Sequence, residues 1–189
     1  VTQGMDKVTT VINNGVAAMM DVAGFNYRSH LYQEAYDKLP QQIVLGSETA
    51  STVSSRGVYK FPVERKAMAM YDDHQSSSYD LEYCDWSNLP EDDWLWHDDK
   101  SWSIGEFVWT GFDYIGEPTP YGWPARSSFF GIVDLAGFPK DVYHLYRSEW
   151  TDETVLHLFP HWNWTPGQEI DMWCYYSNAD EVELYVNGI

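Results

Sequence analysis

Basic residues are scarce in this sequence, which has 11 Lys and Arg against 29 Asp and Glu and a net charge of −18. Proteins that bind nucleic acid or anionic membrane surfaces carry an excess of Lys and Arg. No apolar stretch reaches the roughly 20 residues that cross a bilayer. Nucleic acid and membranes are therefore not expected as partners.

Cysteine is also scarce, and no metal-ligand spacing is present. Cys84 and Cys174 lie far apart, so the sequence neither supports a disulfide nor decides whether the two thiols are free. His157 and His161 are four residues apart, but Pro160 lies between them in a segment with strand character. We expect no metal ion and no cofactor.

The acidic run after residue 88 has the pattern of a helix start. Asn88 precedes Glu91 at capping-box spacing, with Pro90 in the first turn and Asp92 and Asp93 following. Carboxylates are stabilised at the positive end of a helix. This interpretation is favoured over a cluster of metal-binding carboxylates, which remains the alternative.

Aromatic residues are abundant, with 10 Trp, 14 Tyr and 8 Phe. Flat, weakly polar rings stack on the C–H faces of sugars. Most of these residues will fill the core, but their number makes carbohydrate the favoured ligand class.

The first part of the chain alternates between strand and helix patterns. Apolar spacing predicts helices over 7–14 and 29–39 and buried strands over 17–25, 42–46 and 106–113. Such alternation with short connections indicates a parallel α/β unit. The remaining predictions are a long insertion over 51–85 with a helical turn at 65–71 and an exposed loop at 76–78, and a closing helix from Lys140 to Trp150.

The pattern changes near 150–153 to short strands, expected over 155–159, 170–175 and 182–186, as in a β-sandwich. Asn187-Gly188 after an alternating run is a strong hairpin signal. The sequence begins with Val1 rather than Met, so we expect a fragment or a processed piece of a longer protein.

Glu48 is the most informative single residue. It follows the apolar run Ile43–Leu45 and is surrounded by small residues. A carboxylate at the carboxyl end of a buried parallel strand is where barrel enzymes place their chemistry. Many such glutamates are only solvated or ion-paired, so the local pattern leaves its role open.

Three segments resemble glycoside hydrolase family 2, the β-galactosidase and β-glucuronidase family. They are Ile43–Thr49, Gly105–Tyr114 with its Phe-Val-Trp strand, and Ser177–Leu184. The resemblance implies that residues 1–150 are the C-terminal half of a (β/α)₈ TIM barrel, strands five to eight, with strand five ending near Val1. Residues 151–189 would begin a truncated immunoglobulin-like β-sandwich.

The resemblance also implies roles for site residues. Glu48 would be the catalytic nucleophile at the end of strand seven. Tyr27, ending strand six, would hydrogen-bond and orient this nucleophile, and Trp109, ending strand eight, would line the sugar subsite. Asn26 is a weaker substrate-binding candidate. Without the resemblance, core packing would be an equal explanation for Tyr27 and the better one for Trp109.

A retaining glycosidase needs a second carboxylate, about 5–5.5 Å from the first, to protonate the leaving oxygen. In the family this glutamate follows an Asn, and no Asn-Glu dipeptide occurs here. Glu106 begins the predicted strand, at the wrong barrel end, and Glu117 lies in a loop. We therefore expect the acid/base in an N-terminal remainder of the same enzyme and no activity in this chain alone. Assembly into a homo-oligomer is left open.

The substrate is expected to be neutral. Glucuronidases of the family carry an Asn-x-Lys motif after strand eight, and residues 127–140 contain none. A terminal β-galactoside is the favoured substrate. The alternatives are a β-glucuronidase or β-mannosidase of the same family, and a carbohydrate-binding module without catalysis.

Overall fold

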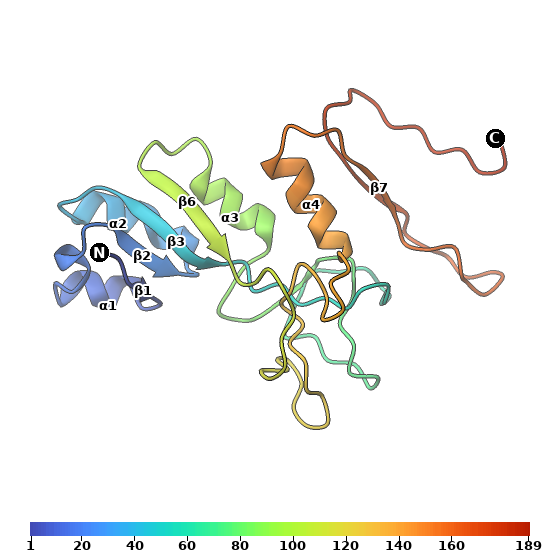
Figure 1. Cartoon of the computed structure of the whole chain (residues 1–189), viewed down its shortest axis with the longest axis horizontal. Helices are drawn as coiled ribbons and strands as arrows, with labels where there is room; N and C mark the ends of the chain where they lie inside the picture. The colour runs from blue at the N-terminus through green and yellow to red at the C-terminus, as the bar shows by residue number, and fades with distance from the viewer.

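The computed structural model describes residues 1–189 as a mixed α/β chain. A parallel sheet with its helices lies at one end, long loops lie in the middle, and helix α4 and a β-hairpin lie at the other end (Figure 1). None of the helices combines the length and the apolar character needed to cross a membrane.

The sheet has four parallel strands in the order β1-β2-β3-β6. Helices α1, α2 and α3 fall between strands along the chain, which confirms the predicted strand–helix alternation. The bounds are β1 Gly4–Met5, α1 Val8–Asn13, β2 Ala23–Asn26, α2 Tyr32–Lys38, β3 Val44–Thr49, α3 Pro90–His97 and β6 Ser103–Val108.

The main hydrophobic core lies between this sheet and helices α1 and α2. Phe25 and Val44 from the strands pack with Val8 of α1 and with Tyr32 and Ala35 of α2, all of them buried. The Tyr32 hydroxyl donates a hydrogen bond of 3.2 Å to the Phe25 carbonyl oxygen. This core fixes the directions of β2 and β3, whose ends carry Tyr27 and Glu48.

The first strands differ from the prediction. The first strand is Gly4–Met5 rather than a segment near Val1, and the predicted strand 17–25 is strand only from Ala23. Ala17–Met19 forms a 3₁₀ helix, η1. The ladder between β1 and β2 begins only at the pair Gly4 and Gly24, so the apolar residues before Ala23 have no strand to pair with.

Helix α3 begins after Leu89, so Asn88 is not its N-cap as predicted. The Leu89 N–H donates to Asp92 Oδ2 at 3.1 Å and closes the first turn. The Asn88 amide instead donates to Ser29 Oγ and Asp93 Oδ1. A long-range contact has replaced the local cap that the spacing suggested.

The insertion over 51–85 contains two short paired strands, β4 Lys66–Ala67 and β5 Glu82–Tyr83. The predicted helical turn at 65–71 is therefore wrong. The serines at 76–78 are buried, also against prediction. Buried carboxylates bind this segment: the Ser77 N–H donates to Glu82 and the Ser78 hydroxyl to Asp141.

Strand β6 starts three residues earlier than predicted and ends at Val108. The residues beyond it pair instead with the segment 130–133: the Thr110 N–H donates to Phe130 and the Asp113 N–H to Val133. Glu106 therefore lies within the strand and not at its start.

Helix α4, Asp141–Trp150, forms where it was predicted, with Val142, Leu145 and Tyr146 buried. It is followed by an antiparallel hairpin, β7 Leu156–Phe159 and β8 Trp173–Tyr176. The predicted strand at 182–186 is absent because that segment has no ladder partner.

The turn at Asn187-Gly188 is present as predicted, with positive φ values of 54° and 81° that asparagine and glycine tolerate. The division into domains at about residue 150 stays a prediction.

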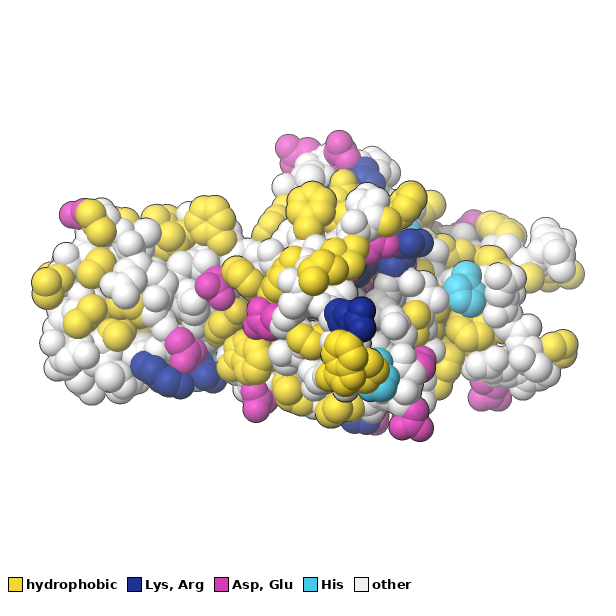
Figure 2. All heavy atoms as spheres, turned by 60° about the horizontal axis from the view of Figure 1, so that its bottom comes forward, with side chains coloured by type: hydrophobic (Ala, Val, Ile, Leu, Met, Phe, Trp, Pro, Cys, Tyr) yellow, Lys and Arg dark blue, Asp and Glu magenta, His cyan; other side chains and the backbone are white.

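Hydrophobic side chains are spread over the visible face (Figure 2). Strand β6 and the hairpin carry several exposed ones, namely Ile104, Phe107, Leu156 and Leu158. Both cysteines are free, and Cys84 is buried.

Candidate active site

The carboxyl ends of the parallel strands meet at one edge of the sheet. In the strand register Asn26 pairs with Glu48, and Thr49 pairs with Val108. Tyr27 and Trp109 follow directly after β2 and β6. Tyr27, Glu48 and Trp109, which are separated by up to 82 positions in the sequence, therefore lie at one edge of the sheet.

Tyr27 and Glu48 are joined by two hydrogen bonds. The Tyr27 N–H donates to the Glu48 carbonyl oxygen at 2.6 Å, and the Tyr27 hydroxyl donates to Glu48 Oε2 at 2.8 Å. Burial of the Tyr27 ring, together with the adjacent Glu48 carboxylate, raises the pKa of the tyrosine. The hydroxyl therefore keeps its proton and remains a donor to Glu48.

These residues line a pocket of about 430 Å³. Its aromatic walls come from Trp86, Trp109 and Phe130, and its carboxylates include Glu48 and Glu117. A concave site with ring faces and a few polar groups suits a sugar. The full lining is Asp6, Lys7, Tyr27, Arg28, Glu48, Ser51, Trp86, Trp109, Glu117 and Phe130.

Trp109 is held by hydrogen bonds from both its main chain and its indole. Its N–H donates to the Thr49 carbonyl oxygen at 2.9 Å, and its Nε1 donates to the Tyr114 hydroxyl at 3.2 Å. Tyr114 in turn donates to Glu117. These hydrogen bonds fix the Trp109 ring beside the pocket and hold the Glu117 carboxylate at the Tyr114 hydroxyl.

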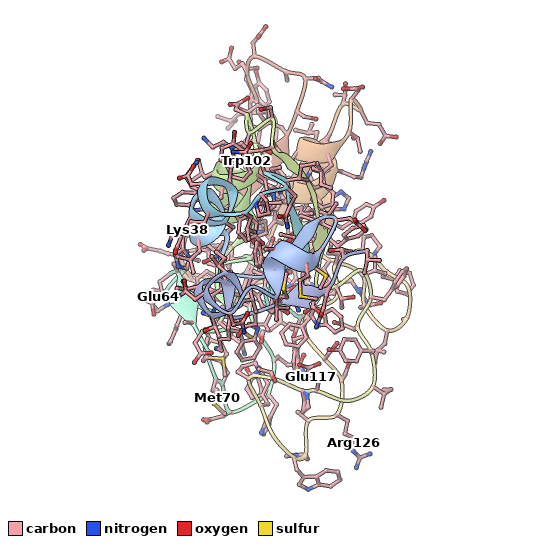
Figure 3. The ribbon with its side chains drawn as sticks, turned by 90° about the vertical axis from the view of Figure 1, so that its left-hand side faces the viewer. Lys38, Glu64, Met70, Trp102, Glu117 and Arg126 are labelled. Carbon is pink, nitrogen blue, oxygen red and sulfur yellow. The ribbon has the colours of Figure 1, made fainter.

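Glu117 is a pocket residue that the sequence did not place in the site. It lies on the long loop after β6, which also carries Arg126 (Figure 3). Trp86, Arg28 and Asp6 were missed as well. Asp6 follows directly after β1 and Arg28 is the second residue after β2, so strand-end position would have indicated them. Trp86 sits in an irregular segment without any such signal.

Asn26 does not line the pocket. Its Oδ1 accepts a hydrogen bond of 2.8 Å from the Ser47 hydroxyl. The same oxygen lies against β1, because a Cβ built on Gly4 would come within 2.6 Å of it. The side chain links three neighbouring strands.

Glu106 is separate from this pocket. Its Oε2 accepts a 2.5 Å hydrogen bond from the Thr49 hydroxyl, and the carboxylate lines another cavity of about 330 Å³ with His97 and Trp150. Burial raises the pKa of Glu106 to about 7. No cluster of three or more His, Cys, Asp or Glu side chains is arranged to hold a metal ion.

Comparison with known proteins gives clear relatives, although no family model matches the sequence. The chain is 53% identical over 181 residues to the β-galactosidase BoGH2A of Bacteroides ovatus, a match that covers 91% of this chain and 21% of that protein. The chain thus spans about a fifth of this curated relative's length.

Solved structures share the fold. A β-glycosidase from Bacteroides vulgatus superimposes with a TM-score of 0.73 at 27% identity, covering 100% of this chain and 30% of that one. A β-glucuronidase from Bacteroides uniformis gives a TM-score of 0.56 at 19% identity, over 83% of this chain and 18% of that one, a likeness of fold alone.

These relatives are glycoside hydrolases, and the chain is similar to them in sequence and in fold. More narrowly, it is homologous to one segment of the enzymes of glycoside hydrolase family 2. The family resemblance seen around Glu48 and Trp109 is thereby confirmed.

Proposed function

We propose that this chain carries the nucleophile half of the active site of a retaining exo-β-glycosidase that hydrolyses terminal β-galactosides. The observation that carries the proposal is the hydrogen bond between Tyr27 and Glu48, which both line an aromatic-walled pocket. The 53% identity to a protein named a β-galactosidase supports the choice of sugar.

In this proposal the parallel sheet corresponds to strands five to eight of a (β/α)₈ barrel, and the hairpin after α4 begins a β-sandwich. The sheet order, the placement of the pocket at the carboxyl ends of the strands and the match to a β-glycosidase structure support it.

The chemistry follows from the residues. The Glu48 carboxylate attacks the anomeric carbon and forms a glycosyl ester while the leaving oxygen takes a proton from a second carboxyl group. Water then attacks the same carbon, gives up a proton to that second group and releases Glu48. Tyr27 donates to the Glu48 carboxylate and orients it, and the indoles of Trp109 and Trp86 pack against the sugar.

The second carboxylate is proposed to lie outside these 189 residues. No Asn-Glu dipeptide occurs in the chain, and Glu106 lines a different cavity. Glu117 shares the pocket with Glu48, but it is bonded by Tyr114 on an irregular loop rather than at a strand end. The chain alone is therefore inactive in this proposal.

A β-glucuronidase is the second candidate, because two cations line the pocket. Lys7 and Arg28 both pair with Asp6, at 2.9 and 3.2 Å, so the three side chains together leave one positive charge that could meet a sugar carboxylate. Comparing turnover of aryl β-galactoside and aryl β-glucuronide by the full-length protein separates the two. Faster turnover of the galactoside supports a β-galactosidase, and faster turnover of the glucuronide supports a β-glucuronidase.

Labelling of the full-length protein tests the nucleophile. We expect a 2-deoxy-2-fluoro-galactoside with a good leaving group to label Glu48, as read by peptide mass spectrometry. Glu48→Gln should abolish the label and lower kcat on the order of a thousandfold or more. The control is Glu64→Gln, at an exposed glutamate of the insertion (Figure 3). This variant should label as the wild type does.

Label on another residue would refute the assignment. Sugar binding without any label or turnover would support a binding module.

A further inference from the structure

Asp93 of helix α3 is fully buried, and both of its carboxylate oxygens are occupied. Oδ1 accepts hydrogen bonds from Ser29 Oγ at 2.6 Å and from Asn88 Nδ2 at 3.0 Å. Oδ2 accepts one from the Ala50 N–H at 2.9 Å. No Lys or Arg pairs with Asp93, so hydrogen-bond donors alone stabilise it.

The segments that Asp93 binds are those that carry the proposed chemistry. Ser29 lies two residues after Tyr27, and Ala50 lies two residues after Glu48. One buried carboxylate therefore holds the chain just beyond both partners of the Tyr27–Glu48 hydrogen bond.

Both segments have unusual backbone conformations. Tyr27, Arg28 and Ala50 have positive φ values of 57°, 58° and 45°. For residues with a side chain this left-handed region is unfavourable and persists only where surrounding contacts impose it. The contacts of Asp93 to Ala50 and Ser29 are contacts of that kind.

We propose that Asp93 is a positioning residue that sets the distance between the Tyr27 hydroxyl and the Glu48 carboxylate. It acts through the main chain, because it does not line the pocket and so does not touch the sugar. This inference rests on the proposed function.

The residue type fits this role. A carboxylate offers about four acceptor sites and no donor, whereas the amide of Asn offers one acceptor oxygen and an NH₂ group. In Asp93→Asn the NH₂ group would face either the Ala50 N–H or the Asn88 amide, and one of these contacts would be lost. Burying a carboxylate without hydrogen-bond partners is costly. The buried carboxylate of Asp93 therefore needs the three donors that surround it.

The test compares two neighbouring acids of α3 in the full-length protein. For Asp93→Asn we expect kcat to fall about 10–100-fold, because small misplacements of reacting groups have effects of that size, while KM changes less than threefold. The rate of Glu48 labelling should fall by the same factor. Amide exchange over residues 49–51 should speed up.

Asp92 gives the matched control. It lies next to Asp93 and caps the same helix, but it pairs with Arg65 at the surface. Asp92→Asn should lower thermal stability slightly and leave kcat and labelling within threefold. If both variants lose activity alike, or if Asp93→Asn keeps wild-type kcat, the positioning role is wrong.

Ser29→Ala keeps the proposal testable if Asp93→Asn does not fold. It removes one donor and leaves the carboxylate in place, and we expect kcat to fall about 3–10-fold at constant KM. Unchanged kcat there would also overturn the role. Failure of wild-type protein to label at Glu48 would instead overturn the proposed function, and the exchange of the Ala50 amide in Asp93→Asn would still decide whether Asp93 anchors that segment.

Discussion

Tyr27 gives Glu48 two donors at once, one from its main chain and one from its hydroxyl. The main-chain bond places the two residues, and the hydroxyl bond orients the carboxylate. Because burial keeps the tyrosine protonated, this donor is present throughout the pH range in which an enzyme of this kind would work.

Tyr27→Phe removes the hydroxyl and keeps the ring. We expect kcat to fall about 10–100-fold, since a hydrogen bond to a charged group contributes about 1.5–3 kcal/mol. Turnover of an aryl β-galactoside by the full-length protein measures this effect.

The control is Tyr36→Phe, at a ring that stacks on Trp102 with centroids 4.9 Å apart and lies away from the pocket (Figure 3 labels Trp102). It should leave kcat unchanged. A Tyr27→Phe protein with wild-type kcat would show that the hydroxyl does not act on the proposed nucleophile.

Single residues at strand ends could be predicted from sequence, and residues on irregular segments could not. Glu48 was indicated by its place after an apolar run, whereas Tyr27 and Trp109 were indicated by the family resemblance. The structure brings all three to one edge because the ends of parallel strands meet there. Trp86 and Glu117 reach the same pocket through loops whose paths depend on distant contacts, such as the Tyr114–Glu117 hydrogen bond.

At the level of elements, the segment after β6 is fixed by a buried ion pair. Lys140 Nζ lies 2.8 Å from Asp113 Oδ2, and Asp113 Oδ1 accepts the Gly131 N–H at 2.7 Å. Burial raises the pKa of Asp113 and lowers that of Lys140, and their mutual attraction opposes both shifts. This arrangement requires the chain at Gly131 to pass very close to the segment 112–113.

Gly131→Ala should therefore be strongly destabilising. A Cβ at this position would lie 2.0 Å from the Asp113 nitrogen and 2.5 Å from the Val133 oxygen, both of them backbone atoms that cannot move aside easily. We expect a loss of about 1–3 kcal/mol or more, seen as a lower Tm and a lower yield of folded full-length protein.

Gly122→Ala is the matched control, because a Cβ there meets nothing within 4 Å and the same loop region carries it. It should leave the Tm almost unchanged. Equal Tm values for the two variants would contradict the close approach at Gly131.

Elements with strong local patterns were predictable, while those that depend on partners were not. Helix α4 and strand β3 form close to the expected residues because their apolar faces have a core to pack against. The apolar run at 17–22 and the alternating run at 182–186 lack a pairing strand and do not become strands. Asn88 lost its expected capping role to contacts with Ser29 and Asp93, which no local pattern reveals.

For the whole molecule, the exposed apolar side chains and the open sheet are the dominant features. Phe107 on β6 is 66% exposed and Leu156 on β7 is 68% exposed. Strands β1 and β6 end the sheet with unpaired edges, which soluble proteins usually cover or protect. In the proposed barrel both edges would pair with strands from the remainder of the enzyme.

The isolated 189-residue chain should show no turnover of an aryl β-galactoside above that of its Glu48→Gln variant, because the proton donor is proposed to lie elsewhere. The measurement uses chain whose folding has been verified by circular dichroism and gel filtration, with the full-length protein as the positive control. Turnover by the isolated wild-type chain, lost in Glu48→Gln, would show that a carboxylate within these residues, such as Glu117, supplies the proton.

Gly4 and Asn26 make two positions of neighbouring strands dependent on each other. Because a Cβ at position 4 would lie 2.6 Å from Asn26 Oδ1, a larger residue at 4 is compatible only with a smaller one at 26. In a library randomised at both positions, functional variants should therefore show correlated choices, with either glycine at 4 or a residue no larger than alanine at 26. The close contact between Gly4 and Asn26 thus determines which substitutions at these two positions can occur together.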